Sequence, residues 1–111
     1  MTETEAAEPR RQQVFTLLVE VGRKAGDGLP GKSTGAALMV YASGVTEAEA
    51  VHETVATLRR ADMNPLDVSG YGTLEEREAE GHDIGEDERA LMARALADNA
   101  VVVAQVTPFY D

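Results

Sequence analysis

An unbroken apolar run from Ala37 to Ala42 leads through Ser43-Gly44 straight into the pattern of a capped helix, and this stretch constrains the fold more than any other. Thr46 can accept a hydrogen bond from the amide of Glu49, whose side chain can reach back to Thr46. Four apolar residues then recur at three- and four-residue spacing: Ala48, Val51, Val55 and Leu58. Because such a stripe needs a partner layer, residues 37–63 predict a buried strand followed by an amphipathic helix.

The rest of the chain predicts three further strands and a second helix. The strands are expected at residues 14–21, 66–72 and 100–106, and the helix at residues 85–99. The strands 14–21 and 37–42 should pair antiparallel across the glycine-rich segment 22–35. The run 100–106 is the most strand-like in the chain, which favours a central place in the sheet. Residues 75–83 suit either an acidic loop or a short edge strand.

The resulting element order, ββαβ(β)αβ, is typical of a small two-layer α+β sandwich. We expect a mainly antiparallel sheet with two helices on one face. This would be a ferredoxin-like variant if residues 75–83 form a strand, with the first strand added at the amino end. The length of 111 residues indicates a single domain, which we place at residues 12–111. Residues 1–11 have no periodic apolar face, and we expect a disordered acidic tail there.

Composition excludes several kinds of site and partner. The chain has no cysteine, which excludes disulfides and thiolate chemistry. Its net charge of −10 disfavours binding to a phosphate backbone. No apolar run approaches the ~20 residues of a membrane span, and the first residues do not resemble a secretory signal. We therefore expect a cytoplasmic protein that binds neither nucleic acid nor membranes.

The segment Gly26–Ser33 matches the phosphate-loop pattern G-x-x-x-x-G-K-[ST]. In that interpretation Gly26 and Gly31 shape the loop, Lys32 contacts a terminal phosphate and Ser33 binds magnesium. A phosphate loop leads directly into a helix whose amino end faces the phosphates, yet the residues after Ser33 are more typical of a strand. A mobile hairpin loop is the competing interpretation. The conformation of residues 33–43 distinguishes the two.

The two histidines give no strong signal for a catalytic or metal site. His82 lies among acidic residues that could coordinate a divalent cation, but it has no second histidine at ligand spacing. His52 falls at the edge of the apolar stripe of the first helix, where a structural role suffices. We therefore predict no catalytic residue, no metal site and no cofactor, and we lean towards a protein that is not an enzyme.

The charges are segregated along the chain. Residues 73–89 carry eight acidic residues and two arginines, whereas segment 22–35 is basic. An acidic segment is usually a solvated face, but it can also dock a basic partner. We expect an interaction or regulatory module that forms a homo-oligomer through a sheet face or edge, or that docks a basic protein through residues 73–89. The alternatives are a protein that binds a nucleotide or a small anion through Gly26–Ser33, and an acidic inhibitor or immunity-type protein.

Overall fold

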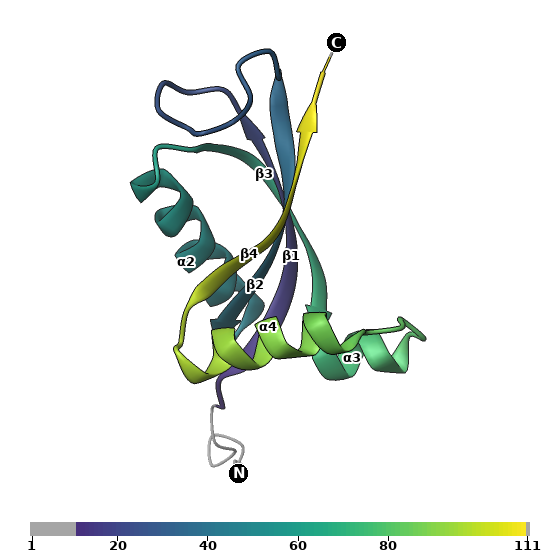
Figure 1. The fold of residues 1–111 in the computed structure, drawn as a ribbon. Coiled ribbons are helices and arrows are strands. Elements are labelled where there is room, and N and C mark those ends of the chain that lie inside the picture. The colour runs from purple at the N-terminus through teal and green to yellow at the C-terminus, as the bar shows by residue number, and fades with distance from the viewer. Residues whose placement is uncertain (1–10, 111) are drawn as a thin grey trace.

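The computed structural model describes residues 11–110, so residues 1–10 of the expected tail lie outside the described part, as does Asp111. The described residues form a small α+β domain with one four-stranded antiparallel sheet and three helices (Figure 1). In chain order the elements are β1 (Gln13–Gly22), β2 (Gly35–Gly44), α2 (Glu47–Arg60), β3 (Asn64–Thr73), α3 (Leu74–Ala79), α4 (Glu86–Ala97) and β4 (Val101–Phe109). In this part of the chain no helix has both the length and the apolar character that crossing a membrane requires.

The sheet has the strand order β3-β1-β2-β4. The predicted antiparallel hairpin of β1 and β2 is confirmed. β3 pairs with β1 and β4 pairs with β2, both antiparallel. Two predictions about strand position are therefore wrong. The first strand lies inside the sheet and is not an addition, and β4 lies at an edge although its apolar sequence suggests a central strand.

Both faces of the sheet carry a hydrophobic cluster. On one face, alternate residues of β1 from Phe15 to Val21 pack with β2 and with Ala50 and Leu58 of α2. On the other, Val14 and Tyr41 pack with Met92 and Ala95 of α4. The expected placement of two helices on one face is therefore wrong, and Figure 1 shows α2 and α4 on different sides of the sheet. The reason is that the hairpin has apolar side chains on both of its faces, and each face needs its own cover.

The second face of β1 is covered only in part. Thr16, which the sequence suggests is wet, is fully buried, with 0% of its surface exposed. Further along the same strand Leu18 is half-buried and Glu20 is exposed. Thr16 is covered because α4 packs over the start of the hairpin and because Arg77 of α3 donates a hydrogen bond to its Oγ1, at 3.1 Å.

Of the two alternatives for residues 75–83, the edge strand is absent, and the acidic loop accounts for only part of the segment. The segment begins with α3, whose first turn is held by a capping box in which Thr73 accepts from the amide of Glu76 and the Glu76 side chain accepts from the amide of Thr73. The sequence Thr-Leu-Glu-Glu contains this signature, which outweighs any strand propensity of the acidic residues. The ferredoxin-like variant depends on that strand and is not confirmed.

The ends of the two longer helices follow their sequence signals, whereas the predicted apolar stripe of α2 is only partly correct. Thr46 caps α2 by accepting from the Glu49 amide, as predicted, but the Glu49 carboxylate accepts from the amide of Val45 instead of Thr46. The buried line of α2 is Ala50, Thr54 and Leu58, and Ala48 is exposed. After α4, Asn99 takes the predicted left-handed conformation, with φ of 49°, and the chain turns into β4.

Gly35 at the start of β2 provides a test of the hairpin. A Cβ at this position would lie 2.5 Å from the carbonyl oxygen of Val21, inside the β1–β2 ladder. Because backbone cannot yield as a flexible side chain does, Gly35→Ala should lower the free energy of unfolding by about 1–3 kcal/mol. Chemical denaturation followed by circular dichroism measures this change. Gly31→Ala is the matched control, because nothing lies within 4 Å of its Cβ position. Equal stability of the two variants would contradict this account of the strand pairing.

Candidate interaction surface

The two edges of the sheet differ in their capacity to pair with another strand. The β3 edge carries Pro65, which lacks an amide hydrogen, and the charged residue Asp67. Its register with β1 also shifts twice, between Thr16 and Leu17 and between Glu20 and Val21. Proline, charge and irregular register are the features that protect an edge strand from further pairing. The β3 edge is therefore guarded.

The β4 edge lacks a comparable charge. Its nine residues, Val101–Phe109, include no charged side chain, and its proline, Pro108, is next to the end. Within the described residues β4 pairs with β2 alone, so its outer side has no strand partner. Val103 and Val106 are 41% and 45% exposed, although they pair across the ladder with Val40 and Leu38, which are buried beneath α2. An exposed apolar edge of this kind is a site for strand addition.

A polar cleft of about 580 Å³ lies between α2 and the beginning of β4. Glu49, Glu53 and Arg60 line it from the helix, and Ala100 and Val101 line it from the strand. Gln12 closes one end by donating from Nε2 to Ser43 Oγ at 2.9 Å and also to Asn99 Oδ1. The two carboxylates of the cleft outnumber its one guanidinium, so the lining has a net negative charge that suits a cationic group.

The glycine-rich segment between β1 and β2 is ordered by a single carboxylate. Asp27 is buried and accepts from the amides of Lys24 and Leu29, at 2.8 and 3.0 Å, and from Arg23 Nε at 3.0 Å. Arg23 Nη1 donates in turn to the carbonyl of Ser33, at 2.6 Å. These contacts tie the two ends of the loop together. The hydrogen bonds from Arg23 and from the two amides lower the pKa of Asp27 to about 2.

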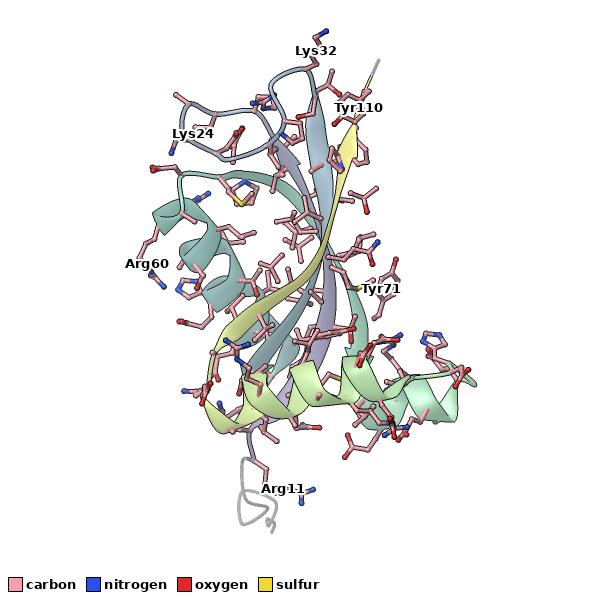
Figure 2. The ribbon with its side chains drawn as sticks, viewed as in Figure 1. Arg11, Lys24, Lys32, Arg60, Tyr71 and Tyr110 are labelled. Atoms are coloured by element: carbon pink, nitrogen blue, oxygen red, sulfur yellow. The ribbon has the colours of Figure 1, made fainter. Side chains whose placement is uncertain are left out.

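The residues of the phosphate-loop pattern are placed on this loop as follows. Gly26 has φ of 82°, and Ser33 is buried with its Oγ donating to the Pro30 carbonyl at 2.7 Å. Lys32 lies at the loop tip, pointing away from the domain (Figure 2). Gly31 has open space around it. The chain then enters β2 at Gly35, so the segment leads into a strand and not into the helix of a phosphate loop. Phosphate binding by these residues stays a prediction.

A partly buried polar cluster joins α3 and α4 to the sheet. The Tyr41 hydroxyl donates to Glu88 Oε1 at 2.8 Å, and Arg77 lies 3.5 Å from the same oxygen. Burial first, and then the Glu88 carboxylate, raise the pKa of Tyr41 to about 12. Sequence reasoning missed this cluster because its members are far apart along the chain and none belongs to a motif. Through Glu88, the cluster holds α4 against Tyr41 of the sheet.

Many charges of the acidic segment 73–89 are used within the domain. Glu76 caps α3, Glu78 pairs with Arg89, and Glu88 contacts Tyr41 and Arg77. His82 accepts at Nδ1 from Arg77 Nε, 3.1 Å away. In residues 11–110 no three His, Asp or Glu side chains converge into a group that could hold a metal ion. His52 is exposed on α2.

The lowered pKa of Asp27 can be tested by carbon NMR of its carboxyl group. The unfolded value is about 3.9, so the carboxylate contacts stabilise the loop fully above pH 4, and this contribution is lost as the pH falls through about 2. Arg23→Gln removes the largest cause, and the titration midpoint of Asp27 should rise towards 3.9. Arg94→Gln, on α4 at the other end of the sheet from the loop (Figure 1), is the control and should leave the midpoint unchanged. An unchanged midpoint in Arg23→Gln would refute this origin of the shift.

Tyr41 gives a prediction at the alkaline end. The unfolded chain ionises tyrosine near pH 10, whereas folded Tyr41 holds its proton up to about pH 12. Stability from this group is therefore complete below pH 10 and is lost as the pH rises towards 12. Tyr41→Phe should lower the free energy of unfolding by about 1–2 kcal/mol at neutral pH. It should also reduce the loss of stability between pH 10 and 12. Tyr71→Phe, at an exposed tyrosine, should do neither. Denaturant unfolding from pH 8 to 12 compares them, and equal behaviour of both variants would contradict the role of the cluster.

Comparison with known proteins places this structure in a family. The model of one domain family, described as a domain of unknown function (DUF8846), matches residues 14–110. Neither the curated proteins nor the solved structures give a match. The matched residues run from the first strand of the sheet to the end of β4 and include both clusters of the core. The chain therefore belongs to the family of domains of unknown function DUF8846.

Proposed function

We propose that this domain is a non-enzymatic interaction module that pairs with a second copy of itself through β4. The observation that supports this most is the contrast between the two edges of one sheet. The β3 edge has a charged residue, Pro65 within the strand and two register shifts, whereas β4 has one register shift and offers an uncharged run with exposed valines. Strand addition would give the outer backbone groups of β4 hydrogen-bond partners.

The exposed valines define a register for this pairing. Directly opposite residues of an antiparallel ladder share a face, so Val103 and Val106 point to the same face as Val40 and Leu38, the face that α2 covers. Antiparallel pairing of two β4 strands can set Val103 of each copy opposite Val106 of the other. Four valines then form one apolar strip, and all are removed from water together.

The open part of the sheet face on the α4 side is a poorer surface for self-association. Glu20 and Asp67 are both exposed and lie directly opposite each other across β1 and β3. Stacking two copies through that face would gather these like charges from both copies in a low-dielectric interface, which is costly. We therefore favour the edge over the face.

The other functions that the sequence suggests have weaker support. One is docking of a basic protein through residues 73–89. This segment offers fewer free carboxylates than its sequence suggests, because Glu76, Glu78 and Glu88 have partners within the domain. Another is binding of a nucleotide or a small anion at Gly26–Ser33. Here the loop leads into β2, so no helix follows it to direct its amino end at the anion. No observation in the described residues favours an inhibitor or immunity-type role over these.

Sedimentation equilibrium over a range of protein concentrations tests the proposal. The wild-type chain should shift from monomer to twice the monomer mass as its concentration rises. Val106→Lys puts a charge in the apolar strip and should weaken association by about tenfold or more. Leu66→Lys is the matched control, because Leu66 is 60% exposed on the guarded edge. It should associate like wild type. A wild-type chain that stays monomeric, or equal effects of the two lysines, would overturn the proposal.

A further inference from the structure

The glycine-rich loop and the end of β4 are fixed to each other. The amide of Thr34 donates to the carbonyl of Phe109 at 2.8 Å, so the loop that carries Lys32 stands beside the last residues of β4 (Figure 2). The polar cleft between α2 and β4 lies at the opposite end of the same strand, where Ala100 and Val101 line it. One edge strand therefore has a cationic loop at one end and an acidic cleft at the other.

Antiparallel pairing brings these two ends together between copies. With Val103 opposite Val106 of the second copy, the ladder also sets Phe109 opposite Ala100. The loop tip of each copy then stands next to the cleft of the other, twice in a symmetric pair. We infer, building on the proposed pairing of β4, that Lys32 of one copy docks into the cleft of the second copy against Glu53.

The charges of both partners suit this contact. Within residues 11–110 none of the ion pairs involves Lys32 or Glu53. Arg23 is engaged with Asp27, so Lys32 is the loop cation at the tip. In the cleft, Glu49 already accepts from the Val45 amide, which makes Glu53 the better acceptor for a lysine. The acidic cleft and the basic loop are thus complementary in charge.

The loop is also prepared for docking. Its hydrogen bonds to Asp27 and from Arg23 fix its shape before contact, so little conformational entropy is lost on binding. Stable interfaces bury on the order of 1,600 Å², and a ladder between two single strands is narrow. Contacts beside the ladder, as between loop and cleft, broaden the interface and select the antiparallel register.

Charge exchange tests the contact, with association measured by sedimentation equilibrium. Lys32→Glu and Glu53→Lys should each weaken association on the order of tenfold, and the double variant Lys32→Glu/Glu53→Lys should recover most of the loss. Lys24→Glu is the control, since Lys24 lies on the other side of the loop from Lys32 (Figure 2). It changes the net charge equally and should have little effect.

Carbodiimide cross-linking of a mixture of isotopically labelled and unlabelled chains gives a second readout. A peptide that joins Lys32 of one label to Glu53 of the other is expected in the wild type and should disappear in Val106→Lys. Association that is sensitive to Val106→Lys but indifferent to both charge reversals, without that cross-link, would overturn the loop contact while leaving the β4 pairing intact. A wild-type chain that never associates would overturn both.

Discussion

Burial of both faces of the β1–β2 hairpin is the constraint on which the rest of the structure depends. The alternate residues from Phe15 to Val21 need α2, while Val14 and Tyr41 need α4. Since one helix cannot cover two faces, the chain must place helices on opposite sides of the sheet. The hairpin occupies the centre, so β3 and β4 are left with the edges. The position of β4 is thus set by the hairpin and not by the sequence of β4 itself.

Local signals in the sequence were sufficient to predict where the two longer helices are capped. The cap at Thr46 and the left-handed turn at Asn99 were predictable because each depends on a few neighbouring residues. The face of the sheet that each helix covers was not predictable from local sequence. Thr16, for example, becomes an interior residue only when Arg77, far along the chain, donates a hydrogen bond to it. Helix α3 could have been predicted in place of the loop or edge strand considered for residues 75–83, since the capping box of Thr73 and Glu76 can be read in the sequence.

Only part of the candidate surface was predictable. The basic loop follows from composition, and self-association through an edge was among the expectations, but the cleft with Glu49 and Glu53 lies outside the acidic segment 73–89 that composition indicates. Which edge is open could not be known, because an edge strand and a central strand can have the same apolar sequence. The phosphate-loop pattern likewise says nothing of how Arg23 and Asp27 fold the loop, nor that the chain leaves it extended at Gly35.

In the proposed pairing, the asymmetry between the edges would also limit the size of the assembly. A sheet with two open edges can add copies at both sides without end, which is the route to aggregation. Here Pro65, Asp67 and two register shifts guard one side, which leaves the β4 side for the proposed pairing. Pairing of like edges about a two-fold axis would use up both open strands, and the proposed assembly would close at two copies. The guarded β3 edge is therefore as necessary to a defined pair as the open β4 edge.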